Sequence, residues 1–270
     1  MLRITCLEEM LGDVPLGERF ARARAAGFDG VDLRGDHLPR DTAGARAAMT
    51  ETGLPVAGVY GRLPGPLLAA TARERAEAVE VVRGRLGEAA RVGAGRLILV
   101  PVFGDSRIAL AEPEQPELGE LAVLLAELAP VAEAARVELV LEPLNGSETH
   151  LLRSPALAAQ VARAVRSAWV GTMLDTYHAD REGQDMVAEI EAAGDRLRLV
   201  HLSDRDRKLP GEGGIDFARV LGALDAAGYA GFCGLECRGS FEVERLAASV
   251  AWLRRQAVPA AAGEASGGDG

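Results

Sequence analysis

Lysine is almost absent from this sequence of 270 residues: Lys208 is the only one among 30 basic residues, and all the others are arginine. Chemistry that requires a lysine Schiff base has a single candidate, and Lys208 lies in a polar, charged segment that does not favour it. Cysteine is also scarce, with only Cys6, Cys233 and Cys237. An odd number of cysteines without a CxxC spacing favours buried thiols in a reduced, cytoplasmic protein over a disulfide framework.

Long apolar runs and an excess of basic charge are missing too. No run approaches the roughly 20 residues of a membrane span, and the amino-terminal MLRITCLEEMLG lacks the layout of a signal peptide. The formal net charge of −10 disfavours nucleic acid or an anionic membrane as a partner. No P-loop, HExxH or GxSxG motif occurs, and the glycine-rich run 211–214 lacks the spacing of a dinucleotide-binding loop.

The sequence does contain a regular alternation of short apolar segments and amphipathic segments. The apolar segments predict strands at residues 2–7, 28–35, 54–61, 95–104, 137–141, 169–175, 196–202 and 231–237. Helical spacing predicts helices at residues 16–26, 43–51 (with Asp41 as its N-cap), 71–92, 114–135, 154–166, 186–193, 215–227 and 241–256. Eight such units predict a single-domain (β/α)8 TIM barrel over residues 1–256. The small and polar residues 257–270 predict a disordered tail.

Three acids and one imidazole stand at the ends of the last four predicted strands: Glu142, Asp175, His201 and Glu236. Because the carboxyl ends of parallel barrel strands share one mouth, we expect these four side chains to converge. Carboxylates combined with an imidazole suit a hard or borderline divalent cation, such as Mn²⁺, Mg²⁺, Co²⁺ or Zn²⁺. The pattern therefore predicts a metal site at the mouth of the barrel.

Four short motifs resemble a known family: EPLN at 142–145, LDTYH at 174–178, HLSDRDR with PGEG across 201–213, and GLE at 234–236. Together they resemble the xylose isomerase-like TIM-barrel superfamily, and most closely its sugar isomerases and epimerases of the ketose 3-epimerase, hydroxypyruvate isomerase and inosose type. The resemblance implies one divalent cation held by Glu142, Asp175, His201 and Glu236. It further implies His178 and Arg207 as substrate contacts, with Glu148 as a supporting residue near the reacting end.

The reaction that this resemblance implies moves a proton on a carbon next to the carbonyl group of a sugar or sugar phosphate, through an enediolate that the cation stabilises. We expect Glu142 and Glu236 to be the catalytic pair, one taking the proton and the other returning it. Two alternatives stay open: a dehydratase or lyase acting on a cyclic polyol or related acid, and a barrel that binds a ligand without catalysis. A zinc endonuclease of the same superfamily would need more than the four histidines present.

Several features stay open or have only a general prediction. We expect residues 104–116 to shape substrate choice, and Tyr60 and Phe103 to form an apolar wall at the mouth. The residues do not identify the sugar or the physiological metal, and they leave open whether the chain forms a homo-oligomer.

Overall fold

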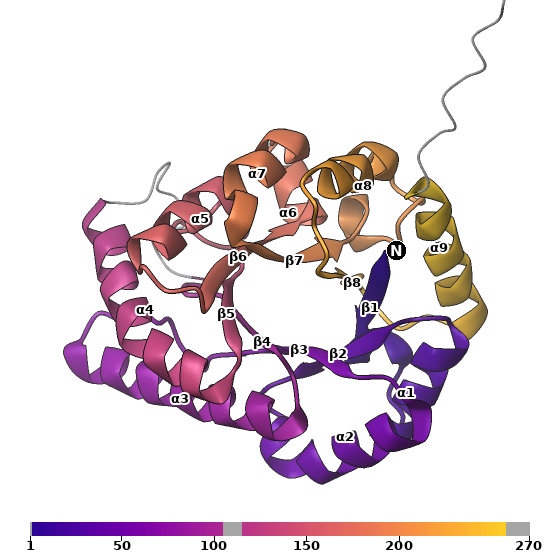
Figure 1. The fold of residues 1–270 in the computed structure, drawn as a ribbon, viewed down its shortest axis with the longest axis horizontal. Helices are drawn as coiled ribbons and strands as arrows, with labels where there is room; N and C mark the ends of the chain where they lie inside the picture. The colour runs from indigo at the N-terminus through magenta and orange to yellow at the C-terminus, as the bar shows by residue number, and fades with distance from the viewer. Residues whose placement is uncertain (1, 105–114, 258–270) are drawn as a thin grey trace, which may run out of the picture.

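Eight parallel strands form a closed barrel in the computed structural model of this chain, which describes residues 2–104 and 115–257 (Figure 1). The strands are β1 (Arg3–Leu7), β2 (Gly30–Arg34), β3 (Val56–Tyr60), β4 (Arg96–Leu99), β5 (Glu138–Leu141), β6 (Val170–Asp175), β7 (Leu197–Leu202) and β8 (Phe232–Leu235). Each strand pairs with the next, and β8 pairs with β1, so the sheet closes on itself. The predicted (β/α)8 TIM barrel is confirmed.

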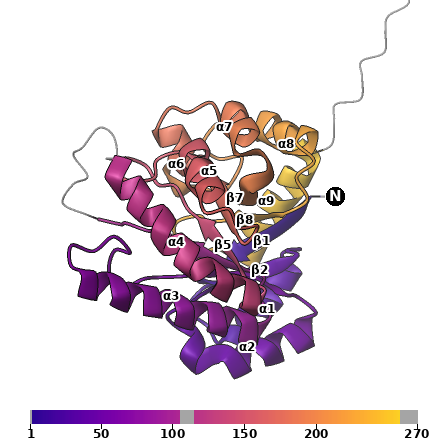
Figure 2. The ribbon, with the colours of Figure 1, turned by 60° about the vertical axis from the view of Figure 1, so that its left-hand side comes forward.

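Helices surround the barrel on its outer side, as the turned view also shows (Figure 2). They are α1 (Leu16–Ala25), α2 (Leu38–Thr52), α3 (Ala72–Val92), α4 (Gln115–Ala135), α5 (Pro155–Ala164), α6 (Thr176–Arg181), α7 (Met186–Ala193), α8 (Phe217–Ala226) and α9 (Val243–Gln256). Three short 3₁₀ helices join them: η1 (Glu8–Leu11), η2 (Gly194–Arg196) and η3 (Arg205–Arg207). None of the helices described is both long enough and apolar enough to pass through a membrane.

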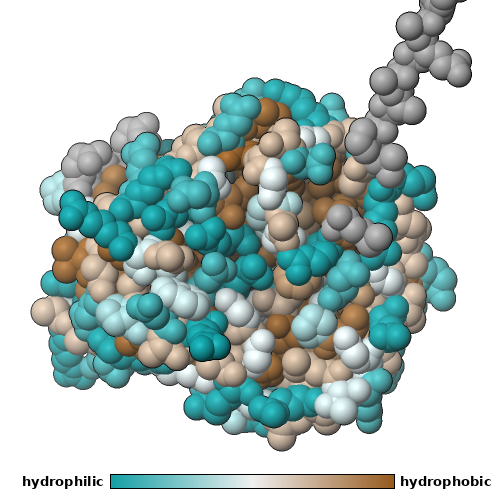
Figure 3. Space-filling model, in the orientation of Figure 1, coloured by the Kyte–Doolittle hydropathy of each residue, from teal (hydrophilic) through white to brown (hydrophobic). Residues whose placement is uncertain are grey.

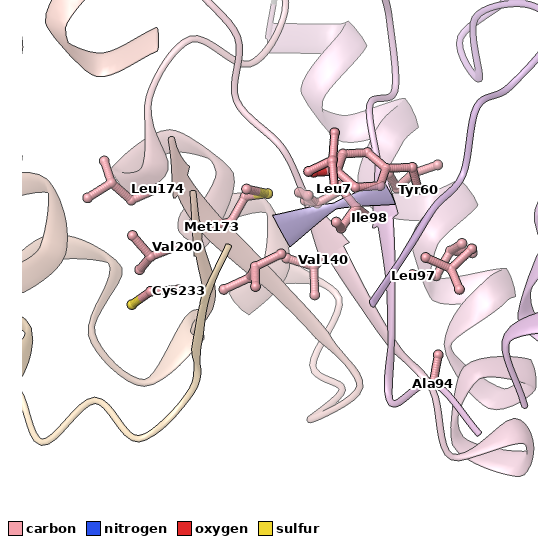
Figure 4. Close-up of a cluster of buried hydrophobic side chains, with 14 of the residues drawn as sticks. Leu7, Tyr60, Ala94, Leu97, Ile98, Val140, Met173, Leu174, Val200 and Cys233 are labelled. Atoms are coloured by element: carbon pink, nitrogen blue, oxygen red, sulfur yellow. The ribbon is translucent and has the colours of Figure 1, made fainter. Parts of the chain in front are cut away.

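Apolar side chains fill the barrel and the layer between strands and helices. Every residue of β3 and of β6 is buried, as expected for strands covered on both faces. Figure 4 shows apolar side chains from different strands gathered together, among them Ile98, Val140 and Val200. Because the interior is packed, polar chemistry is left to the ends of the barrel. The three cysteines are buried and free, as the sequence predicted.

The outer helices are amphipathic, which explains how a chain that is nearly half hydrophobic presents a hydrophilic surface. Helix α9, for example, buries Leu246, Val250 and Leu253, while Arg254 and Arg255 lie in its last turn. The space-filling view shows hydrophilic residues around the periphery of one face, with hydrophobic residues visible between them (Figure 3).

The start of α2 differs from the prediction. The helix begins at Leu38, so Asp41 lies in its first turn and is not its N-cap. His37 holds the N-cap position without a side-chain capping bond, and Pro39 occupies one of the first two helical positions. Proline is well suited to a first helical turn because its φ angle is already helical, which accounts for the earlier start.

The segment after β6 also differs, because the sequence analysis predicted no helix there. Helix α6 begins directly after Asp175, whose carboxylate accepts the backbone N–H groups of Tyr177 at 2.8 Å and His178 at 3.4 Å. His178 therefore stands on a helix. The predicted tail lies outside the described residues except for Ala257, and the 104–116 loop does so for the most part.

Candidate active site

Four side chains meet at the carboxyl ends of the last four strands. Glu142 follows β5, Asp175 ends β6, His201 lies near the end of β7, and Glu236 follows β8. The strand register sets Asp175 opposite His201 and His201 opposite Gly234, so these ends are level with one another. One ligand atom from each of the four lies within 4.8 Å of those of the other three. We call these four residues the acid–histidine cluster.

His201 is the centre of this cluster and is fully buried. Its Nδ1 lies 3.0 Å from Oε2 of Glu236, 3.8 Å from Oε1 of Glu142 and 3.9 Å from Oδ2 of Asp175. Its other ring nitrogen, Nε2, lies 3.1 Å from the hydroxyl of Tyr60. One edge of the imidazole thus faces the three acids, and the other faces a tyrosine.

Burial and the charges around them shift the pKa values of the two glutamates of the cluster in opposite directions. Burial, reinforced by the negative charge of Glu236, raises the pKa of Glu142 to about 8. At Glu236, burial is outweighed by the charge of Arg207 and the hydrogen bond from His201, so its pKa falls well below the usual range. At His201, burial opposes ionisation, but the bond to Glu236 and the charges of Glu142 and Asp175 raise its pKa to about 9. Without a cation, the pKa values of the two glutamates are therefore shifted in opposite directions.

Arg207 reaches the cluster from η3. Its Nη1 donates to Oδ2 of Asp175 at 2.7 Å and to Oε2 of Glu236 at 3.0 Å. The guanidinium carbon lies 4.3 Å from the ring centroid of Tyr177, a cation–π distance. Its backbone φ of 58° is in the left-handed region, which is unfavourable for a residue with a side chain. The loop conformation and the charges together direct this guanidinium at the acids.

The contacts of His178 determine which of its nitrogens carries the proton. Its Nδ1 lies 3.1 Å from the backbone nitrogen of Asn145, which can only donate. The Asn145 amide nitrogen lies 2.8 Å from the same atom and also donates to Oε1 of Glu148 at 2.8 Å. Burial lowers the pKa of His178 and keeps the ring neutral. A neutral imidazole carries one proton, so it is on Nε2, 2.8 Å from the donor Nη2 of Arg207.

A cavity of about 860 Å³ opens above the cluster. Five of the seven sequence-predicted site residues line it, namely Glu142, Glu148, His178, Arg207 and Glu236, whereas Asp175 and His201 are not among its lining residues. It is large enough for a small organic substrate.

The comparisons with known proteins agree with this architecture. The family model for the xylose isomerase-like TIM barrel matches residues 20–256. The chain belongs to this family. It is 30% identical over 218 residues, 80% of this chain and 73% of the relative, to an L-ribulose 3-epimerase of Mesorhizobium japonicum. It is 28% identical over 244 residues, 88% of this chain and 93% of the relative, to a 3-dehydro-D-guloside 4-epimerase of Escherichia coli.

Solved structures of sugar epimerases share the fold. An apo 3-keto-D-glucoside 4-epimerase from E. coli superposes with a TM-score of 0.86 and 25% identity, covering 94% of this chain and 100% of that one. A D-psicose 3-epimerase from Clostridium cellulolyticum, solved with D-tagatose, gives a TM-score of 0.85 at 19% identity, covering 95% of this chain and 99% of that one. The relatives named here are sugar epimerases.

The acid–histidine cluster fits the divalent cation that the family resemblance implied. Three carboxylates and one imidazole are the oxygen and nitrogen donors that Mn²⁺, Mg²⁺, Co²⁺ and Zn²⁺ accept. The donor atoms already lie within 4.8 Å of one another. Burying three acids this closely is unfavourable unless positive charge compensates them. Among the described residues, Arg207 and His201 supply that charge in part.

Two residues that contact histidines of the site had no such role in the sequence analysis. Asn145 lies three residues after Glu142 in the EPLN motif, and this position was the only sequence signal that could have pointed to it. Its bond to His178 joins residues 33 positions apart and forms only in the folded chain. Tyr60 was predicted only as an apolar wall with Phe103. Both do line the cavity, but Phe103 is 65% exposed and Tyr60 binds His201.

Proposed function

We propose that this protein is a divalent-metal-dependent sugar isomerase or epimerase that moves a proton on the carbon next to a carbonyl group. The observation that carries this proposal is the approach of Glu142 and Glu236 to one point from β5 and β8, beside Asp175 and His201. These two strands are not neighbours in the barrel, so the two carboxylates reach that point from different directions. The cluster also opens into a cavity of substrate size.

Glu142, Asp175, His201 and Glu236 would hold the cation. When bound, it would act as a Lewis acid that stabilises the negative charge developing on the substrate oxygen as the proton leaves carbon. The proton itself is carried by the side chains of this chain. Positioning of the two glutamates at the reacting carbon then contributes to the rate.

Glu142 and Glu236 are suited to opposite roles in that proton transfer. Without a cation their pKa values lie on opposite sides of neutrality, which is the arrangement that separates an acid from a base at one site. An epimerase requires one carboxylate to remove a proton from one face of a carbon and another group to return one to the opposite face. We assign these two steps to the two glutamates.

His178 and Arg207 would orient the substrate. The nitrogens Nε2 of His178 and Nη2 of Arg207 lie 2.8 Å apart, and with the proton of His178 on Nε2 both are donors. Two donors cannot satisfy each other, whereas one oxygen acceptor placed beside the pair, within reach of both N–H groups, would satisfy both. A hydroxyl or carbonyl oxygen of a sugar is such an acceptor. Glu148 holds Asn145, which in turn orients His178, so its role is to support this contact.

The substrate class is supported by the relatives. L-ribulose and 3-dehydro-D-guloside, named in the first two, are keto sugars. A keto group next to a carbon that bears hydrogen is what the proposed proton transfer needs. We therefore infer a keto sugar or its phosphate as the substrate.

The test is solvent exchange of carbon-bound hydrogen. The protein with Mn²⁺ is incubated in D₂O with a panel of ketoses, 3-dehydroglycosides, hydroxypyruvate, inososes and dehydroshikimate, and deuterium incorporation and products are followed by NMR. We expect incorporation and an isomer or epimer with at least one keto sugar. Elimination of water would indicate a lyase instead, and no exchange on any compound by metal-loaded protein would indicate a barrel that only binds.

Variants assign the roles. Glu142→Gln and Glu236→Gln should each abolish deuterium incorporation, while Glu138→Gln is the matched control. Glu138 is on the same strand as Glu142 but at the opposite end of the barrel, where it pairs with Arg96 and Arg198. If both site variants retain full exchange, the assignment of the catalytic pair is wrong.

A further inference from the structure

Tyr60 makes a contact across the width of the barrel that the proposed proton transfer does not use. It ends β3, and its hydroxyl lies 3.1 Å from Nε2 of His201 on β7. In the strand order β3 and β7 are separated by three strands on either side, so they stand on opposite sides of the barrel. The two rings are stacked, with centroids 5.6 Å apart and planes 28° from parallel.

The contact bears directly on how His201 can act as a ligand. A nitrogen that binds a cation must present a lone pair, and a neutral imidazole has one bare nitrogen and one N–H. Nδ1 is the nitrogen that faces Glu236, Glu142 and Asp175. The N–H must then be on Nε2, where the Tyr60 hydroxyl oxygen is in position to accept it.

We propose that Tyr60 is a positioning residue that keeps His201 protonated at Nε2 and directs the Nδ1 lone pair at the three carboxylates. The inference rests on the proposed metal site. Histidine ligands generally donate their second N–H to a protein group, which sets both the tautomer and the ring orientation. Here that group is a neutral phenol from the far side of the barrel.

The surroundings leave Nε2 with few other acceptors. His201 is fully buried and Tyr60 is 8% exposed, so water has little access to the bond. Asp32, a buried acid on β2, accepts from the hydroxyl of Thr5 at 2.5 Å through Oδ2, and its Oδ1 has no hydrogen-bond partner among the described residues, so neither oxygen is bonded to Nε2. In this arrangement, removing the Tyr60 hydroxyl would take away the acceptor of a buried N–H, which is unfavourable.

The experiment measures Mn²⁺ binding, not turnover. The dissociation constant is determined from the EPR signal of free Mn²⁺ for wild type, Tyr60→Phe and Tyr229→Phe. Phenylalanine keeps the stacked ring and removes only the hydroxyl. Tyr229 is the matched control, because its hydroxyl donates to the carbonyl of Phe232 at 2.7 Å, at the start of β8 and away from the cluster.

We expect Tyr60→Phe to bind Mn²⁺ roughly 10- to 100-fold more weakly, while Tyr229→Phe binds like wild type. Equal affinity of Tyr60→Phe and wild type would refute the role of Tyr60 and leave the proposed function intact. Equal weakening in both variants would also refute it, since any buried hydroxyl would then have the same effect. A wild type that binds no Mn²⁺ would overturn the proposed function itself.

A second measurement reads the tautomer of His201 directly, first in the wild type and then in Tyr60→Phe. Long-range ¹H–¹⁵N spectra of the Zn²⁺-loaded wild type report which nitrogen of each of the four histidines is protonated. We expect His201 to show a metal-bound Nδ1 and a slowly exchanging proton on Nε2, and we expect that exchange to accelerate in Tyr60→Phe. Coordination through Nε2, or an Nε2 proton that exchanges equally fast in both proteins, would refute the proposal.

Discussion

Two histidines of the candidate site each have one ring nitrogen engaged by a group outside the acid–histidine cluster. Tyr60 contacts Nε2 of His201, and Asn145 contacts Nδ1 of His178. The free nitrogens therefore differ: His201 presents Nδ1 to the acids, and His178 presents Nε2 towards Arg207. A ligand needs a lone pair and a substrate contact of this kind needs a donor, so in the proposed function one and the same Nε2–H tautomer would serve two purposes, with His201 presenting its bare Nδ1 and His178 its Nε2–H.

The tautomer of His178 can be tested with amide side chains. Glutamine places an N–H donor near the position of Nε2, whereas asparagine places its amide near Nδ1. We expect His178→Gln to retain roughly tenfold more kcat/KM than His178→Asn, the size of one hydrogen bond to substrate. Steady-state kinetics on the substrate found by deuterium exchange measure this. Higher activity in the asparagine variant would show that Nδ1 is the nitrogen that acts.

Among the elements, the loop after β7 is organised around one buried carboxylate. Asp204 is fully buried and accepts the backbone N–H groups of Arg205 at 2.9 Å, Gly211 at 2.9 Å and Ile215 at 3.0 Å. Within the loop, residues 206 and 207 have φ angles of 59° and 58°. Non-glycine residues in this region cost about 1–3 kcal/mol each and persist only where surrounding contacts hold them. Asp204 supplies such contacts and so holds Arg207 over the cluster.

Removing that carboxylate should loosen the loop without touching the cluster. We expect Asp204→Ala to accelerate amide hydrogen exchange across residues 205–215 and to raise KM at least tenfold, because Arg207 is no longer held in place. Asp216→Ala is the control: Asp216 caps α8 through the N–H of Arg219, and its loss should lower stability by about 1 kcal/mol with little change in KM. Unchanged exchange in Asp204→Ala would show that the loop is held by other contacts.

The element boundaries show what local sequence can and cannot predict. Helix α3 begins after Thr71, whose side chain and that of Glu74 form a capping box, and Gly93 ends it in a left-handed conformation. Such signals are local, so the prediction for that helix was accurate. Helix α6 has six residues and no apolar repeat, and it begins because the Asp175 carboxylate accepts two backbone N–H groups. A helix this short cannot be read from periodicity.

The capping box of α3 gives a direct measure of such a local signal. Replacing Thr71 with alanine removes the hydroxyl that accepts from the backbone N–H of Glu74 at 3.2 Å. We expect a loss of about 1 kcal/mol in unfolding free energy, measured by urea denaturation. Thr50→Ala is the control, since its hydroxyl bonds the Arg46 carbonyl within α2 and caps nothing. An equal loss in both would indicate a generic effect of the threonine hydroxyl.

For the whole molecule, the closure of the barrel explains which parts of the site were predictable. Parallel strands bring their carboxyl ends to one mouth, so Glu142, Asp175, His201 and Glu236 could be grouped from strand order alone. The contact between Tyr60 and His201 spans 141 residues and depends on barrel width and rotamers, which no motif encodes. The opposed pKa values of the two glutamates likewise arise from burial and charges that only the assembled fold creates.

The same assembly makes the stability of the metal-free protein depend on pH. The folded chain holds the Glu142 proton up to a pKa of about 8, against an ordinary value of 4.5, and the His201 proton up to about 9, against 6.5. For each group, at pH values between its ordinary pKa and its raised pKa, the folded state binds more protons than the unfolded state. The free energy of unfolding therefore falls as pH rises through that range. At roughly 1.4 kcal/mol per pKa unit, the shift at Glu142 alone corresponds to a decrease on the order of 5 kcal/mol. Glu236, with its lowered pKa, acts in the opposite direction, and only as pH falls through the acid range.

We therefore expect the unfolding free energy in EDTA, measured with urea, to fall from pH 5.5 to pH 9. Saturating Mn²⁺ should flatten this dependence, because a cation takes the place of the protons on the acid–histidine cluster and binds only the folded state. The Glu142→Gln variant is the control without metal: glutamine cannot ionise, so the variant should lose the contribution of Glu142 to the slope and keep that of His201 between about pH 6.5 and 9. A flat profile for the metal-free wild type would show that the cluster carries its negative charge at neutral pH even without a cation.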